Sequence, residues 1–250
     1  MEKNKTTIIE QFENKISFFS NNVFFGLLII GLLGLTIRIL FLHIDIPMNS
    51  DNLFYFMAAI DQSLGHTSKT IFAANDGWPS FLSLFFWISQ SNNFMDYMTL
   101  QKILTVVISV TTIIPIYFLG KQFVSKSYSL LGSAIFIFEP RIIQNSLEGT
   151  TDPLSIIAIT ISLALIFNKK YYFQYIAFAT LSLAILVRSE AMFLLPIFFI
   201  IFFIRSGINK KSLINLFIII IIITSILLPM SVIRTEHLGH DGMTERISSG

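Results

Sequence analysis

Residues Leu42–Gln101 read LHIDIPMNSDNLFYFMAAIDQSLGHTSKTIFAANDGWPSFLSLFFWISQSNNFMDYMTLQ and form the one long polar interval between hydrophobic segments. This interval holds five of the fifteen acidic residues of the chain: Asp45, Asp51, Asp61, Asp76 and Asp96. Asp51 precedes an apolar-periodic segment, Leu53–Leu64, and Trp78-Pro79 opens a second one that ends at Ser89. The pattern predicts a small helical subdomain between the first two hydrophobic segments. We expect it to form the floor of an active site on the outer face of a membrane.

The composition predicts an all-α polytopic membrane protein. Of the 250 residues, 54% are hydrophobic and only 13% are charged, whereas soluble domains carry about a quarter charged residues. The apolar residues come in long runs, such as the isoleucines of 218–223, which suit helices that face lipid. A net charge of +2 gives no indication of a nucleic-acid partner. The absence of cysteine excludes disulfides and thiol catalysis.

Seven hydrophobic segments indicate about seven transmembrane helices. They are Val23–Leu42, Ile103–Gly120, a segment from Ser127 towards Asn145, Pro153–Phe167, Tyr171–Val187, Ala191–Ile204 and Ser212–Ile233. The first would be about 30 Å long as a helix, which matches the core of a bilayer. The third has only twelve apolar residues before Glu139-Pro140, so we expect its helix to run on through them. The chain then divides into an N-terminal segment 1–22, a transmembrane module 23–233 with an outward loop 43–101, and a polar tail 234–250.

The distribution of charge predicts the orientation. With seven spans, residues 1–22, 121–126, 168–170 and 205–211 share one side of the membrane, and these segments contain ten basic residues and only three acids. The positive-inside rule places this side in the cytoplasm. We therefore expect a multi-pass plasma-membrane protein with a cytoplasmic N-terminus, surrounded by membrane lipids, whose long loop faces outward.

Three outward elements bring charged side chains to the same membrane face. The first is the long loop, with Asp45 and Asp51. The second is the connection between the third and fourth spans, with Glu139, Arg141, Glu148 and Asp152. The third is the tight corner between the fifth and sixth spans, with Arg188 and Glu190. The fourth to sixth spans are short, so their outer ends are expected to be recessed around a cavity. Charges at membrane depth usually face a cavity or a partner.

Four of these residues also have a purely structural interpretation. Asp51 could cap the helix that follows it, and Asp152 before Pro153 has the features of a helix N-cap. Arg188 and Glu190 could simply pair across a tight corner. The sequence alone leaves both interpretations open for each residue.

The order of these motifs resembles the membrane glycosyltransferases of the GT-C class. More narrowly, it resembles the protein O-mannosyltransferase-like family 39 and its aminoarabinose- and oligosaccharyl-transferring relatives. The motifs that carry the resemblance are Arg38 near the end of the first span, Asn49-Ser50-Asp51-Asn52-Leu53-Phe54-Tyr55, Gly77-Trp78-Pro79, Phe138-Glu139-Pro140-Arg141 with Leu147-Glu148-Gly149-Thr150-Thr151-Asp152-Pro153, and Leu186-Val187-Arg188-Ser189-Glu190. The likeness covers about residues 23–235 and implies a GT-C-type helical bundle.

The resemblance implies a catalytic chemistry and a role for each residue. It implies a donor sugar on a polyprenyl phosphate and an acceptor that is a protein, a lipid or a glycan. Asp51 is then the catalytic base, and the departing phosphate needs cations, for which Arg141 and Arg188 are candidates. Glu148 or Asp152 would orient the acceptor or hold a divalent metal ion, and Arg38, Glu139 and Glu190 would also bind substrate.

Two departures from the family pattern affect these expectations. Many relatives carry a second acid where this chain has Asn52, and the oligosaccharyl branch has an acid where this chain has Asn49, so the use of a metal stays open. Relatives also continue with further spans or a soluble domain, so we expect a truncated or partial member of the family.

Two other functions compete with glycosyl transfer. The main alternative is a secondary transporter or lipid flippase, which would usually show internal repeats with broken spans in matching halves. The long loop after the first span has no counterpart later in the chain, which disfavours a repeat. A non-catalytic scaffold is the other alternative, and it would not need acids gathered on one face.

Overall fold

The computed structural model describes residues 22–46, 48, 50–66, 75–91, 93–168 and 170–238. In these ranges the chain forms helices and no strands, as predicted for an all-α membrane protein. The predicted N-terminal surface segment and most of the predicted polar tail lie outside them. The helices are α2 (Val23–Phe41), α3 (Ser50–Ser63), α4 (Gly77–Ser89), α5 (Phe94–Thr111), α6 (Ile113–Gly120), α7 (Lys126–Ile137), α8 (Pro140–Leu147), α9 (Asp152–Ile166), α10 (Tyr171–Val187), the 3-10 helix η1 (Ser189–Leu194), α11 (Leu195–Ser206) and α12 (Lys210–Leu238).

Four helical segments within the described residues are long and apolar enough to cross a membrane. They are Val23–Phe41, Phe94–Gly120, Ser189–Ser206 and Lys210–Glu236. Asp152–Ile166 and Tyr171–Val187 are shorter apolar helices. The last helix continues through Arg234 to Leu238, beyond the end expected at Ile233. Together these helices make the chain an integral membrane protein.

The third predicted span does not run on as one helix. α7 ends at Ile137, and a new helix, α8, begins at Pro140. Pro140 has no N–H and cannot continue a helix, whereas it suits the first position of a new one. The Glu139 carboxylate caps α8 by accepting a hydrogen bond of 2.8 Å from the Ile142 N–H. The expectation of a continuous helix through Glu139 was therefore wrong.

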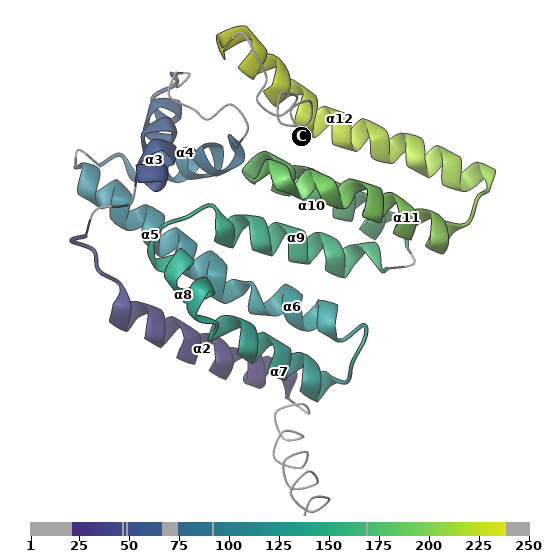
Figure 1. Ribbon diagram of the computed structural model, residues 1–250, viewed down its shortest axis with the longest axis horizontal. Helices are drawn as coiled ribbons and strands as arrows, with labels where there is room; N and C mark the ends of the chain where they lie inside the picture. Colours follow the sequence, from purple (N-terminus) through teal and green to yellow (C-terminus); the bar gives the residue numbers. More distant parts are fainter. Residues whose placement is uncertain are drawn as a thin grey trace, which may run out of the picture.

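The long helices stack side by side in one layer after another. Figure 1 shows α2 with α7 along one side, then α5–α6 and α9, and then α10, α11 and α12 along the other. α2 comes close to its neighbours through glycine. A Cβ on Gly34 would lie 2.3 Å from Ile137 Cδ1, and one on Gly31 would lie 3.3 Å from Ile113 Cδ1. Small residues at such contacts are typical of packed membrane helices.

The connections of the bundle gather at two opposite ends. The connections α6–α7, α9–α10 and α11–α12 lie at one end (Figure 1), which we call the basic end. α3, α4, α8 and the start of α9 lie at the other, which we call the loop end. This is the division of segments that the alternation of spans predicts.

The loop end has a hydrophobic core of its own. Trp78, Leu82 and Phe86 of α4 are fully buried, together with Phe56 of α3 and Val187 at the end of α10. The rings of Phe56 and Phe86 meet edge to face with centroids 5.8 Å apart, an arrangement that stabilises aromatic pairs. The long polar interval therefore folds into the small helical subdomain that its periodicity predicts, and it docks onto the bundle at α10.

Candidate functional site

The turn between α8 and α9 is held against the start of α3. Gly149 has a φ of +74°, a conformation that glycine adopts without strain. The Gln101 amide donates to the Gly149 carbonyl at 2.7 Å. The Asn52 side-chain amide donates to the Glu148 carbonyl at 2.9 Å, and the Gln144 amide donates to the Glu148 carboxylate at 2.8 Å. α3 and the turn therefore occupy fixed positions relative to each other.

The start of α9 and the corner after α10 meet in a cluster of charged side chains. The Asp152 carboxylate pairs with the Arg188 guanidinium and accepts a 2.5 Å hydrogen bond from the Asn145 amide. Arg188 Nε also lies 3.7 Å from the Glu190 carboxylate. Asp152 is 24% exposed, Arg188 41% and Glu190 56%. The structure therefore brings together three of the residues singled out in the sequence, in contact with solvent.

A second ion pair lies behind this corner and is buried. Arg234 of α12 donates to the Asp76 carboxylate at 3.2 Å, and both side chains are 3% exposed. Asn75 accepts a 3.0 Å hydrogen bond from the Ser189 N–H, which fixes the backbone directly after Arg188. The pair therefore ties the start of α4 and the end of α12 to the charged corner.

Gly77 allows α4 to dock at this corner. A Cβ at this position would lie 2.6 Å from the Val187 nitrogen and 2.9 Å from the Leu186 oxygen. These are backbone atoms and cannot move aside as a flexible side chain can. The Gly-Trp-Pro motif therefore has a packing explanation: glycine permits the close approach, and Trp78 fills the core beneath it.

Arg38 is fully buried inside the bundle. Its guanidinium donates to Ser146 Oγ, Ser109 Oγ and the carbonyls of Gly34 and Ile137, all at 3.0–3.1 Å. The side chain has no exposed surface. These contacts join α2 to α5, to the end of α7 and to α8, so the geometry supports a structural role.

The charged residues of α8 have different surroundings. Glu139 is the N-cap of α8, as described above. Arg141 is exposed on the same helix. The contacts of Glu139 therefore account for its position without a substrate, whereas Arg141 presents its charge at the surface.

Asp51 is an exposed residue in the first turn of α3. The helix begins at Ser50, so Asp51 is inside the first turn and not at the cap position. A carboxylate there is stabilised by the helix dipole. Since the adjacent Asn52 is bonded to the Glu148 carbonyl, the Asp51 Cα lies within about 11 Å of that oxygen.

A pocket at the loop end lies beside this turn, between the end of α2 and α8. Its volume is about 490 Å³, and its walls include Ile37, Phe41, Ile143, Leu147 and Met48. Its polar lining comes from His43, Lys102, Gln144 and Glu148. This apolar pocket lies on the α2–α8 side of the bundle, with Glu148 in its wall.

Lys102 brings a positive charge to that pocket. It is 4% exposed, and its ammonium donates to the carbonyls of His43 at 2.8 Å and Ile46 at 2.6 Å. An ammonium has three donors, so these two bonds leave a third proton. The residue therefore fixes the chain after α2 and places a cation in the wall of the pocket.

The described part of the chain gathers no three carboxylate or imidazole groups that could hold a metal ion. Asp152 and Glu190, which both approach Arg188, form the nearest acidic grouping at the corner. An arginine between the two carboxylates fits a salt-bridge network better than a cation site.

Sequence reasoning missed four residues of this end: Asn75, Asp76, Lys102 and Arg234. Two of them carried a usable signal. Lys102 and Arg234 flank long uncharged runs, and a charge at a membrane helix end usually has a partner. Lys102 finds its partners in the chain after α2, and Arg234 finds its partner at the start of α4. No local pattern in the sequence specifies either contact.

The comparison with protein families identifies the chain. A family model described as dolichyl-phosphate-mannose-protein mannosyltransferase matches residues 80–232. The chain belongs to this family. The membership confirms the resemblance to GT-C mannosyltransferases. No curated protein and no solved structure matches the chain. For this family member, the matched range includes α9, α10 and the Asp152–Arg188–Glu190 cluster, whereas Arg38 and Asp51 precede it.

Proposed function

We propose that this family member transfers a sugar from a polyprenyl-phosphate carrier to a hydroxyl acceptor at the outer face of the plasma membrane. Membership of the mannosyltransferase family supports glycosyl transfer in a membrane. Mannose is the sugar we expect, and a protein is the first acceptor to test. The basic end then faces the cytoplasm, in keeping with the positive-inside rule.

The pocket between α2 and α8 is the observation that supports a lipid-linked donor. It combines apolar walls with the Lys102 ammonium and the Glu148 side chain. A prenyl chain suits the apolar walls, and a phosphate suits the cation. Met48 lines the pocket three residues before Asp51, so the proposed base is close to the point where the donor's phosphate would lie.

The reaction can be written with the residues of this end. The Asp51 carboxylate takes the proton from the acceptor hydroxyl, and the acceptor oxygen attacks the anomeric carbon of the donor sugar. The bond from that carbon to the phosphate oxygen breaks, and the polyprenyl phosphate leaves with the electron pair. Lys102 stabilises the negative charge that develops on the phosphate.

Arg141 and Arg188 would have different roles in this reaction. Arg141 is adjacent on α8 to the face formed by Pro140, Ile143, Gln144 and Leu147, which lines the pocket. It can therefore supply a second cation to the phosphate. Arg188 is already paired with Asp152, so we assign it to holding that carboxylate in place.

Asp152 is suited to orienting the acceptor. Its two oxygens accept hydrogen bonds from Asn145 and Arg188, which fixes the side chain and occupies lone pairs that a general base needs. A partly exposed, rigid carboxylate can still accept from an acceptor hydroxyl. Glu148 and Glu190 are candidates for further contacts to the substrates.

The proposal is tested by transfer in proteoliposomes. The purified chain is reconstituted and given radiolabelled mannosyl phosphoryl polyprenol with a serine- and threonine-rich peptide. We expect label on the peptide, and none when a nucleotide-activated mannose replaces the lipid-linked donor. Movement of the donor between leaflets without any transfer would support the flippase alternative instead. A lack of both would reject the proposal for this chain.

A further inference from the structure

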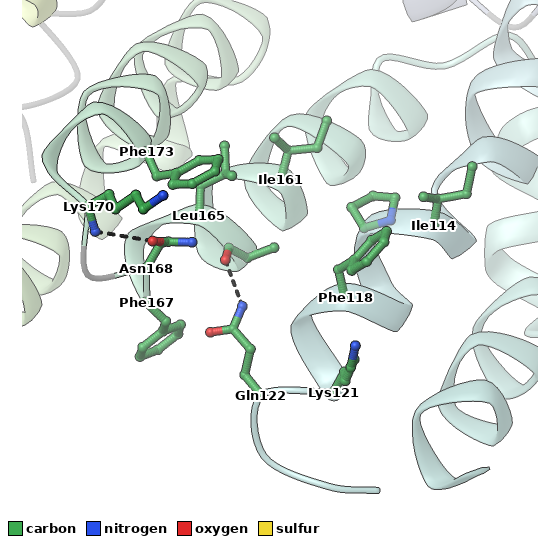
Figure 2. A pocket seen from close by; sticks show the side chains of 12 residues that line it. Ile114, Phe118, Lys121, Gln122, Ile161, Leu165, Phe167, Asn168, Lys170 and Phe173 are labelled. Carbon is green, nitrogen blue, oxygen red and sulfur yellow. Dashed lines mark hydrogen bonds between the residues drawn. The ribbon is translucent and has the colours of Figure 1, made fainter. Parts of the chain in front are cut away.

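A second groove lies at the basic end, between α6 and α9. Its volume is about 950 Å³, at the upper end of the range for small-molecule sites. Figure 2 shows the two walls facing each other, with Ile114 and Phe118 on α6 opposite Ile161 and Leu165 on α9. Ile114 is 46% and Phe118 53% exposed, so the groove is open along its side. It is on the other end of the helices from the pocket proposed for the donor.

The groove is apolar along its length and polar where the helices end. The polar lining consists of Lys121, Gln122, Asn168 and Lys170, which all follow the last turns of α6 and α9. The Gln122 amide reaches across and donates to the Ala164 carbonyl at 2.6 Å (Figure 2). Asn168 Oδ1 accepts from the Lys170 N–H at 3.1 Å. A ligand that fits both parts needs a long apolar portion and a polar head at the membrane boundary.

The positive charge of the basic end determines which headgroup a bound ligand would carry. The sequence has no Asp or Glu in 97–138, 153–189 or 191–235, which contain all three connections of the basic end. Lys121 and Lys170 line the groove, and the Arg205 guanidinium lies 6.0 Å from the ring of Phe167 in its wall. The three connections contain no carboxylate that could neutralise these cations. They would attract an anion and repel the ammonium of a zwitterionic lipid.

We propose that the groove binds an anionic glycerophospholipid of the leaflet that borders the basic end. The phosphodiester lies between Lys121 and Lys170, and an acyl chain follows the groove past Phe118 and Leu165 towards Ile114 and Ile161. The lipid thereby joins α6 to α9 at the end where Gln122 provides a direct link. It is a structural ligand, separate from the lipid-linked donor.

Native mass spectrometry of the 250-residue chain tests this proposal. The chain is released from mixed micelles with equal amounts of phosphatidylglycerol and phosphatidylcholine of the same acyl length. Each lysine near a membrane surface contributes enough to change anionic-lipid affinity several-fold, so two predict a preference for phosphatidylglycerol of about tenfold or more. The double variant Lys121→Gln/Lys170→Gln should lose this preference. The control Lys126→Gln/Lys210→Gln removes two exposed cations of the same end that do not line the groove, and it should keep it.

Two further probes distinguish the lipid from its headgroup alone. Excess inorganic phosphate should leave the bound phosphatidylglycerol in place, because the apolar walls contribute to binding. Dihexanoyl phosphatidylglycerol should bind at least about tenfold more weakly than the long-chain lipid, because fewer methylenes are buried. Equal binding of the two headgroup types by the wild type, or equal loss in the double variant and its control, would overturn the proposal.

Discussion

Arg38 shows what a buried charge does in this bundle. Its guanidinium distributes four hydrogen bonds over α2, α5, α8 and the last carbonyl of α7. The broken helix pair α7–α8 exposes carbonyl and hydroxyl acceptors, and Arg38 satisfies several of them at once. The same position near the end of the first span resembles a family motif, and its contacts here explain that position by packing.

Replacing Arg38 with alanine should therefore destabilise the fold. Loss of a fully buried, hydrogen-bonded charged side chain typically costs about 3–5 kcal/mol of unfolding free energy. Thermal unfolding in detergent measures the loss as a lowered midpoint. Arg141→Ala, at an exposed site on α8, is the control and should stay within about 0.5 kcal/mol of the wild type. Equal midpoints for the two variants would mean that the Arg38 contacts contribute little.

The buried pair of Asp76 and Arg234 gives a second prediction at the residue scale. Breaking a buried ion pair by removing one partner costs about 3–5 kcal/mol, because the other charge stays buried. Asp76→Asn and Arg234→Gln should each destabilise the chain, and the double variant should cost less than the two effects added together. A double-mutant cycle on unfolding midpoints measures this coupling. Strict additivity would show that the two side chains do not act as a pair.

Sequence reasoning at the residue scale identified charges more easily than their surroundings. It singled out Asp152, Arg188 and Glu190, which do meet in space. It also grouped Arg38 and Glu139 with them, although one is enclosed by helices and the other caps α8. Whether a charged residue reaches the exposed corner depends on where the chain turns between α8 and α9. Tertiary packing sets the position of that turn, and spacing along the sequence does not.

At the scale of elements, helix breaks and close approaches position the site. Pro140 ends one helix and starts the next, so the α8–α9 turn lies beside α3. Helix α4 reaches the α10 corner because Gly77 has no side chain. Periodicity predicted α3 and α4 well, because both have clear apolar faces. It could not predict the α7–α8 break, because a mid-span proline can also be accommodated as a kink.

Gly77→Ala should displace α4 from this corner. The added methyl group would overlap the backbone of Leu186 and Val187, and such overpacking typically costs about 1–3 kcal/mol. We expect a lower unfolding midpoint in detergent. Gly132→Ala in α7 is a matched control, since a Cβ there has open space. It should be neutral or stabilising by up to about 1 kcal/mol. A Gly77 variant as stable as the Gly132 variant would contradict the packing described here.

At the scale of the whole molecule, the bundle separates its charges. The connections at one end are basic and contain no acid, whereas the carboxylates of the proposed site lie at the other end. The separation of segments was predictable, because it needs only the order of spans and their charges. The position of the substrate pocket was not, because it depends on which helices pack together.

Single cysteines can test the orientation directly, since the chain has none of its own. Gln90→Cys follows α4 at the loop end, and Lys126→Cys starts α7 at the basic end. A membrane-impermeant maleimide should label the first in intact cells and the second only after permeabilisation. Labelling in the reverse order would place the proposed active site in the cytoplasm.

The measurement that tests glycosyl transfer at the loop end most directly is the effect of Asp51→Asn on transfer from a polyprenyl-phosphate donor. Asparagine keeps the size of the side chain and removes the proton acceptor, so transfer should fall by about 10²–10⁴-fold. The unfolding free energy should fall by no more than about 1 kcal/mol, the contribution of a carboxylate to the helix dipole in the first turn of α3. Asp61→Asn, on the same helix, should transfer at the wild-type rate. If Asp51→Asn retains wild-type transfer, Asp51 is not the base, and Glu148 in the pocket wall is the next carboxylate to test.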